Sequence, residues 1–232
     1  MSYSTETPGA GTYRPLFAPE VFEYVGLDVA AGPNVDVVCD SFIMEPFADQ
    51  SFDLCVSGQT FEHNPFFWAT FAEIARVLTP GGMALIIAPG GGQVHCTPYD
   101  CYRFYPDAWI GLCALTGLEL VESYFESDQT AFVAPGGPWR DCAVIVRRPE
   151  MPADIEAEFY HKLKTIVAPL RGQGMNMGPS NGDKAPTRLG PAFGAYESAV
   201  YATFGDGKRK ELAWKLQGRK KPRLFGRNAP AA

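Results

Sequence analysis

One stretch, residues 52–92, constrains the fold more than any other part of the chain. It begins with an apolar run at residues 52–56, which is too short for a helix and therefore predicts a buried strand. A second apolar run at residues 83–88 is followed by proline and three glycines. With a helix between them, these runs imply parallel strands, a right-handed crossover and a ligand crevice at the strands' carboxyl ends.

The intervening segment predicts a loop and then the helix. Residues 57–64 are polar and contain Glu62 and His63, which indicates a loop at the end of the first strand. Apolar residues then recur at the spacing of one helical face, with Glu73 and Arg76 on other faces. The Pro-Gly-Gly at residues 80–82 ends the helix, because proline cannot continue it and glycine accepts positive φ.

Several short motifs occur in a defined order: FDLCVS at residues 52–57, EH at 62–63, RVLTPGG at 76–82, and an apolar strand ending in AP at 88–89. This order resembles the class I S-adenosylmethionine-dependent methyltransferases, and most closely their type 11 group of small-molecule enzymes. The resemblance covers about half of the chain, from residue 24 to residue 146. It implies an α/β fold with a Rossmann-like, mostly parallel sheet and helices on both faces.

The resemblance also implies S-adenosylmethionine as cofactor and indicates the residues that hold it. Asp28 follows a predicted strand at residues 24–27, where an acidic residue of the family accepts hydrogen bonds from the ribose hydroxyls. Asp40 follows the next predicted strand and would lie beside the adenine. A turn aspartate is the alternative for Asp28, and Asp53 could serve only as a cap or local partner. The full predicted cofactor set is Asp28, Val29, Asp40, Ser41, Phe42, Ser57, Gly58 and Gln59.

A loop at residues 90–106 follows the second strand, at the end of the sheet where substrate loops belong. Its His-x-x-Pro-x-Asp-x-x-Arg pattern resembles a subgroup of these methyltransferases associated with sugar and glycan pathways. His95 is the first choice for the base that deprotonates a hydroxyl or amine, because imidazole titrates near neutral pH. His63 is the second choice, with helix capping and loop positioning as its alternative.

Three further residues of the same loop are candidate substrate contacts, namely Arg103, Tyr99 and Tyr102. Asp100 is predicted to orient His95 or to bind sugar hydroxyls. A structural pair between Asp100 and Arg103 is the alternative. The assumed methyl transfer needs no metal, so no metal ligand is predicted.

The start of the chain departs from the family pattern. The family opens with a central strand that ends in a glycine turn, whereas residues 1–20 contain no strand-like run. The fold is therefore predicted to be reduced at its N-terminal strand. The two strands beside the gap would pair directly or accept a strand from a partner, rather than a strand from residues 5–17, which contain two prolines. Weak cofactor binding by the isolated chain follows from this prediction.

The distribution of charge divides the chain into two predicted parts. Residues 1–150 contain six arginines and no lysine against nineteen acidic residues, whereas residues 151–232 contain fourteen basic and seven acidic residues. We predict a methyltransferase-like domain at residues 1–149 and a C-terminal extension at residues 150–232. The extension comprises a helix, a loop rich in glycine and proline, and a basic tail that could contact an acidic partner.

Composition and missing motifs narrow the classes of protein to which the chain could belong. No run approaches the ~18 apolar residues of a membrane helix, and six cysteines without a CxxC pair indicate free thiols and a cytoplasmic location. The predicted function is O- or N-methylation of a small polar metabolite or sugar. A non-catalytic methyltransferase-like binding module or partner subunit is the alternative, and a homo-oligomer is possible. A nucleic-acid methyltransferase is less favoured, because the chain lacks the Asn/Asp-Pro-Pro-aromatic motif of the amino-methylating kind.

Overall fold

The computed structural model describes residues 12–92, 94–95, 99–126 and 139–172. All of these residues belong to the first of two compact units, Met1–Asp183. The second unit, Lys184–Ala232, lies outside the described residues, and so do the predicted loop rich in glycine and proline and the basic tail.

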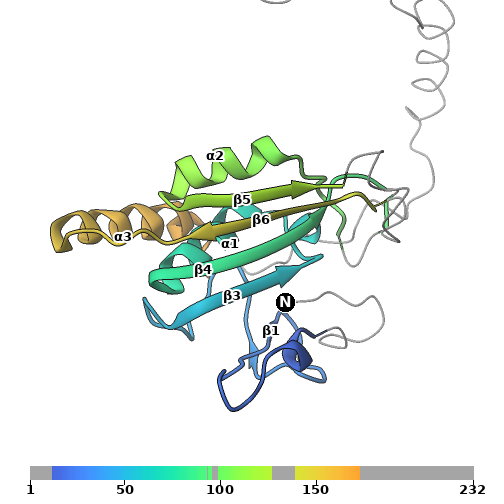
Figure 1. Cartoon of the computed structure of the whole chain (residues 1–232), viewed down its shortest axis with the longest axis horizontal. Coiled ribbons are helices and arrows are strands. Elements are labelled where there is room, and N and C mark those ends of the chain that lie inside the picture. The colour runs from blue at the N-terminus through green and yellow to red at the C-terminus, as the bar shows by residue number, and fades with distance from the viewer. Residues whose placement is uncertain (1–11, 93, 96–98, 127–138, 173–232) are drawn as a thin grey trace, which may run out of the picture. The chain divides into compact units, whose positions relative to one another are not determined.

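A four-stranded sheet with the order β3-β4-β6-β5 forms the centre of the described part (Figure 1). Strands β3 (Phe52–Gly58) and β4 (Leu78–Pro89) are parallel, as the sequence predicts. Strand β6 (Asp141–Arg147) is antiparallel to both β4 and β5 (Glu119–Phe125). Because β6 runs backwards, its first residue lies opposite Pro89 at the carboxyl end of β4.

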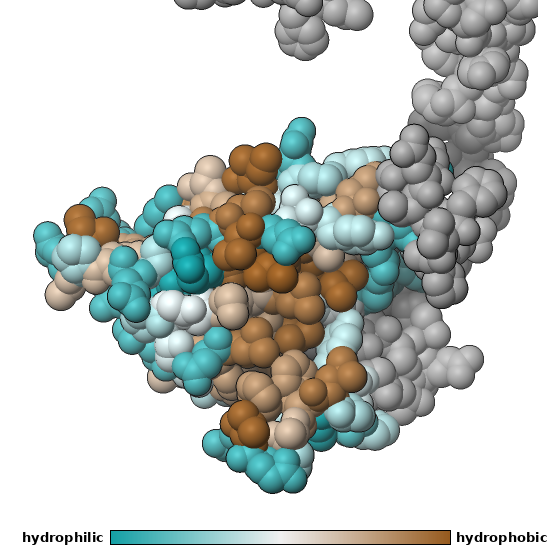
Figure 2. Space-filling model, in the orientation of Figure 1, coloured by the Kyte–Doolittle hydropathy of each residue, from teal (hydrophilic) through white to brown (hydrophobic). Residues whose placement is uncertain are grey.

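Helices α1 (Phe67–Val77) and α2 (Pro106–Thr116) contact the strands of this sheet, and α3 (Ala153–Val167) packs on these two helices. Each of them contacts the other two, which gathers them on one side of the sheet. The predicted α/β class is confirmed, and the described α-helices lie on one side of the sheet where the sequence predicted helices on both faces. Figure 2 shows apolar side chains exposed over the sheet on the side that faces the viewer. The 3-10 turns η1 (Arg14–Leu16), η2 (Phe61–His63) and η4 (Ala168–Leu170) complete the described helical elements.

Helix α2 is fixed to the core by an aromatic side chain and ends at a glycine. Trp109 is fully buried and its ring stacks on Phe104, with 5.1 Å between ring centroids. Gly117 ends the helix with a φ of 87°, a left-handed conformation that glycine adopts without a steric penalty. No described helix is both long enough and apolar enough to cross a bilayer.

Helix α1 departs from its prediction, because both of its charged residues are buried. Glu73 is 3% exposed and Arg76 is 5% exposed. The Arg76 guanidinium donates hydrogen bonds to Glu73 and to the carbonyls of Met44 and Phe47, at 2.8–2.9 Å. The helix therefore holds a loop that precedes it in the chain by about thirty residues, a contact that helical periodicity cannot reveal.

Asp49 extends this ion-pair network towards the surface. Its carboxylate accepts hydrogen bonds from Arg76 at 3.0 Å and from Lys164 of α3 at 2.7 Å. Burial alone would raise the Asp49 pKa, but the two cations lower it below its ordinary value.

We expect Asp49→Asn to destabilise the chain by ~1 kcal/mol at pH 7. A lowered folded pKa stabilises the fold above the unfolded pKa, and this contribution is lost as pH falls through the folded value. The difference between wild type and variant should therefore shrink in acid. Urea unfolding at pH 7 and at about pH 3, below the ordinary aspartate pKa, measures it. A difference that stays constant would contradict the assignment.

The N-terminal part forms a second, smaller sheet. Strands β1 (Leu27–Asp28) and β2 (Val37–Val38) are parallel and pair only with each other among the described residues. Direct pairing of β1 with β3, one of the two predicted ways to close the gap, is therefore not found there. Residues 14–16 form η1 rather than a strand. Residues 1–11 lie outside the described residues, and donation of a partner strand stays a prediction.

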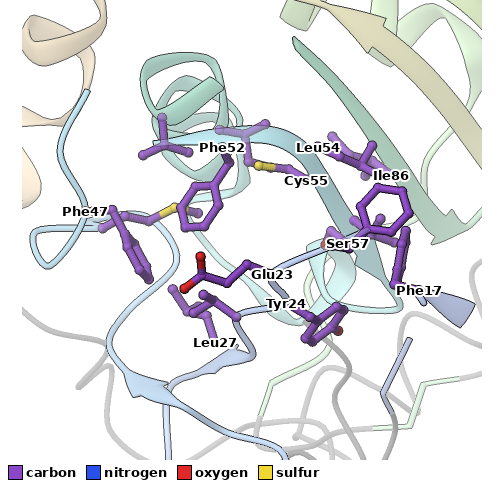
Figure 3. Close-up of a pocket in the computed structure, with 16 residues that line it drawn as sticks. Phe17, Glu23, Tyr24, Leu27, Phe47, Phe52, Leu54, Cys55, Ser57 and Ile86 are labelled. Atoms are coloured by element: carbon purple, nitrogen blue, oxygen red, sulfur yellow. The ribbon is translucent and has the colours of Figure 1, made fainter. Parts of the chain in front are cut away.

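A pocket of about 120 Å³ lies between the two sheets (Figure 3). Tyr24 and Leu27 line it from the side of β1, Phe47 from the loop after β2, and Leu54 and Ser57 from β3. Most of its lining is aromatic or aliphatic. It marks the gap where the sequence predicts a missing strand, and Ser57 is the one predicted cofactor residue that lines it.

Candidate functional site

The predicted ribose residue Asp28 lies at the carboxyl end of β1 and is 5% exposed. Its Oδ1 accepts a hydrogen bond from the Ala30 backbone N–H at 3.3 Å. The Cys39 N–H donates to the Asp28 carbonyl at 3.0 Å, which brings the segment after β2 alongside. Asp28 and Asp40 therefore follow neighbouring parallel strands at the same edge of the small sheet, as predicted.

Two predicted cofactor residues keep buried polar atoms without a hydrogen-bond partner in the described part of the chain. These atoms are Oδ1 of Asp40 and Oγ of Ser57. Burial raises the pKa of the Asp40 carboxyl. Since nearly all buried polar atoms of folded proteins have a partner, such atoms at strand ends indicate a ligand. Asp53 differs, because its Oδ1 accepts a hydrogen bond from Thr79 at 2.9 Å and so has the local role.

The turn after β3 is strained and closely packed. Gln59 has a φ of 52°, a left-handed conformation that is uncommon outside glycine and often found at functional sites. Its side chain donates to Asp141 at 2.9 Å. A Cβ on Gly58 would lie 1.9 Å from the Tyr13 hydroxyl, so a larger residue here would have to displace the Tyr13 side chain. Tyr13 and Asp141 are site neighbours that sequence reasoning missed, because they come from distant parts of the chain.

Hydrogen bonds join the turn after β3 to the segment after β2. The Asn64 side-chain amide donates to Ser41 Oγ at 3.1 Å and to Thr70 Oγ1 at 2.5 Å. Ser41 Oγ also lies 3.0 Å from Thr70 Oγ1. Phe42 is fully buried against Phe66, so its side chain belongs to the core, and only its backbone could face the predicted adenine. Val29 is half-buried beyond the end of β1.

The structure brings the two predicted catalytic histidines together. Their rings lie edge to face, with 4.8 Å between the centroids of His63 and His95. The Nδ1 of His63 lies 2.5 Å from the Tyr99 carbonyl oxygen, so we assign the proton to Nδ1. This bond ties η2 to the loop of His95, which is the positioning role considered from the sequence. Burial lowers the pKa of His63.

Asp100 contacts both His95 and Arg103, its two predicted partners. Its Oδ2 lies 3.3 Å from His95 Nδ1 and accepts hydrogen bonds from the His95 backbone N–H at 2.9 Å and from Arg103 at 2.8 Å. Burial alone would raise the Asp100 pKa, but these bonds and the charge of the Arg103 guanidinium lower it. The orienting role and the ion pair, which the sequence posed as alternatives, therefore coexist.

The predicted substrate residues have different surroundings. Arg103 is paired with Asp100. The Tyr102 hydroxyl donates to the Pro65 carbonyl at 3.1 Å, and its ring packs on Phe67 with 4.7 Å between centroids. Tyr102 thus has a packing role, whereas Tyr99 contributes its backbone carbonyl to the site. Substrate contacts by these residues stay a prediction.

Glu62 is the functional candidate that the sequence reasoning left without a role. It lies on η2, is 1% exposed, and has no hydrogen-bond partner for either carboxylate oxygen among the described residues. Its Oε1 is 3.6 Å from His63 Nε2, which is too long for a hydrogen bond. Burial raises the Glu62 pKa to about 8. The Glu-His pair could be recognised in the sequence as part of a family motif, whereas the burial of the glutamate follows only from the fold.

Comparison with known proteins supports the resemblance in part of the chain. Residues 8–86 match the family described as a methyltransferase domain. An uncharacterized methyltransferase of Mycobacterium avium is 35% identical over 101 residues, covering 37% of this chain and 40% of that protein. A counterpart from Mycobacterium leprae is 31% identical over 101 residues, covering 37% and 38%. A putative methyltransferase structure from Bacillus halodurans has a TM-score of 0.45 at 17% identity, covering 61% and 89%.

These matches confirm the predicted methyltransferase resemblance for residues 8–86, about a third of the chain. The chain spans about two fifths of the length of the curated relatives it matches. S-adenosylmethionine is the cofactor that this family implies. Asp40 Oδ1 and Ser57 Oγ, which are buried without a partner among the described residues, provide polar groups that fit such a ligand.

Proposed function

We propose that this chain is an S-adenosylmethionine-dependent methyltransferase that acts on oxygen or nitrogen of a small polar metabolite or sugar. The observation that carries the proposal is that Asp40 Oδ1 and Ser57 Oγ are buried without a hydrogen-bond partner in the described part of the chain. The family match over residues 8–86 and the strained turn at Gln59 support it.

In this proposal the chain's residues divide into two groups. Asp28, Asp40 and the turn at Ser57 hold the ribose and adenine of the cofactor, which supplies the methyl group when bound. The cluster of His95, His63 and Asp100 faces the acceptor. Catalysis would come from positioning of the two reactants and from removal of a proton from the acceptor.

His95 is the first candidate for the proton acceptor. Its Nδ1 lies 3.3 Å from Asp100 Oδ2 and 3.4 Å from the Arg103 guanidinium. We assign the proton to Nδ1, towards the carboxylate, which leaves Nε2 as the basic atom. A neutral imidazole in this tautomer can accept the proton of a hydroxyl or amine during methyl transfer. Arg103 holds the Asp100 carboxylate in place and so stabilises the arrangement.

Calorimetric titration with S-adenosylhomocysteine tests the cofactor site. Asp28→Ala should weaken binding by roughly tenfold to a hundredfold, because a charge-assisted hydrogen bond contributes ~1.5–3 kcal/mol. Asp53→Ala is the matched control, since Asp53 pairs with Thr79 and should leave the affinity unchanged. Equal losses in the two variants would count against the ribose assignment.

The same titration separates the enzyme from the non-catalytic module proposed as its alternative. A module that only keeps the fold would bind neither S-adenosylmethionine nor its product. If binding is found, incubation with a panel of sugars and small hydroxyl- or amine-bearing metabolites should yield a methylated product and S-adenosylhomocysteine in equal amounts. Mass spectrometry of both products measures this. Binding without turnover on any acceptor would favour the module.

A further inference from the structure

Three potential metal ligands meet at the end of β3 and in the loop after β4. Glu62, His63 and His95 each offer one ligand atom, and all three atoms lie within 4.8 Å of one another. Two of these residues are adjacent on η2, and the third is 32 positions later in the chain. The fold therefore assembles two imidazoles and one carboxylate around a single point.

The carboxylate of Glu62 is the observation that points to a ligand. The side chain is 1% exposed, and neither oxygen has a hydrogen-bond partner among the described residues. A carboxyl group buried in this way ionises only where a cation or hydrogen-bond donors compensate its charge, and a bound metal ion would supply that charge. The nearest imidazole nitrogen, His63 Nε2, is 3.6 Å from Oε1, a separation that a metal ion could bridge but a hydrogen bond does not.

Both histidines are oriented as metal-binding histidines usually are. In such sites the second ring nitrogen donates to a backbone carbonyl or a carboxylate, which fixes the tautomer and ring direction. His63 Nδ1 has the Tyr99 carbonyl as this partner at 2.5 Å. His95 Nδ1 has the Asp100 carboxylate at 3.3 Å, and Arg103 in turn holds that carboxylate. We therefore assign the Nε2 atoms as the ligands.

From this geometry we infer that Glu62, His63 and His95 bind one divalent transition-metal ion, of which zinc is the best fit. Two imidazoles and one carboxylate match the ligand set of catalytic zinc sites, where a fourth position holds water or substrate. Tetrahedral ligands ~2.0–2.1 Å from zinc lie about 3.3 Å apart, so the loop of His95 would close by an ångström or more on binding. Softer metals that prefer thiolates are disfavoured, because the three donors are nitrogen and oxygen.

The inference goes beyond the proposed function and does not depend on it. A metal at this point could hold an acceptor oxygen and activate it, in which case His95 would act as a ligand rather than as a free base. Metal binding can be measured without any acceptor or cofactor, so failure of one proposal leaves the other to be judged separately.

The test uses the full chain, stripped with a chelator and then titrated with zinc chloride in a calorimeter. We expect one ion per chain in the wild type. Removing a residue that only hydrogen-bonds to a metal ligand typically lowers metal affinity roughly 10–100-fold. Removing a ligand itself, by His63→Ala or Glu62→Gln, should therefore lower the zinc affinity by more than about 100-fold. His161→Ala is the matched control, because His161 is an exposed residue of α3 and the third histidine of the chain.

Cobalt as a substitute ion identifies the ligands by a second measurement. Binding at the three proposed residues should give the visible absorption of a low-symmetry cobalt site without a thiolate charge-transfer band, which excludes the cysteines. Glu62→Gln keeps the shape of the side chain, so circular dichroism should show an intact fold. Absence of a stoichiometric zinc site in the wild type, equal affinity in Glu62→Gln and His161→Ala, or a thiolate band would each overturn the inference.

Discussion

Replacing His95 with alanine should lower kcat by about 10²–10⁴-fold, the usual contribution of a positioned general acid or base. The imidazole is held by Asp100 at 3.3 Å and lies edge to face with His63, so its direction is fixed before an acceptor arrives. The affinity for S-adenosylhomocysteine should stay unchanged, because no predicted cofactor contact involves His95. Initial rates with an acceptor from the screen and calorimetry measure the two effects.

Two controls make this result specific. His161→Ala should retain the wild-type kcat, because His161 is exposed on α3. Treatment with a chelator distinguishes the two roles open to His95. If the stripped wild type stays active while His95→Ala does not, the imidazole itself accepts the proton. If stripping alone removes the activity, a metal ion activates the acceptor. Unimpaired turnover in His95→Ala would show that His95 has neither role.

The elements around the central β-α-β stretch could be predicted because their signals are local. An apolar run, a helical spacing or a proline or glycine that ends an element can be recognised from residues close together in the chain. Such signals indicate β3, α1 and the left-handed Gly117. Strand β4 begins earlier than expected, at Leu78 rather than residue 83. The Pro-Gly-Gly segment interrupts the register between Leu78 and Met83 without ending the strand.

The candidate site was predictable only as a list of residues. Motif order singled out His63, His95 and Asp100, but the contact between His63 and His95 joins two loops more than thirty residues apart and depends on how these loops fold back. That Glu62 is buried without a hydrogen-bond partner among the described residues could not be read from the sequence, because a polar residue in a polar loop normally faces water. Tyr13 was missed for a similar reason, since it approaches Gly58 from the N-terminal segment.

The burial of the charged residues of α1 also could not be predicted from the sequence, and it leads to the second prediction with a large expected effect. Replacing Arg76 with methionine should destabilise the chain by about 3–5 kcal/mol, because it leaves Glu73 as a buried, unpaired charge. The Met44 N–H also donates to Glu73 at 2.7 Å, so helix and loop share this one carboxylate. The carbonyls of Met44 and Phe47 would lose their donor as well. Urea unfolding at neutral pH measures the loss.

Lys164→Met is the matched control for this network. Lys164 is 47% exposed, pairs with the outer carboxylate, Asp49, and lies over the Tyr160 ring at 5.5 Å from its centroid, so its removal should cost no more than ~1 kcal/mol. The double variant Glu73→Gln/Arg76→Met should recover part of the loss, because no unpaired charge remains in the core. The loop held by Arg76 continues from the predicted adenine segment, so cofactor affinity should fall in Arg76→Met and not in Lys164→Met. A loss below about 1 kcal/mol in Arg76→Met would mean that the network is replaceable by packing alone.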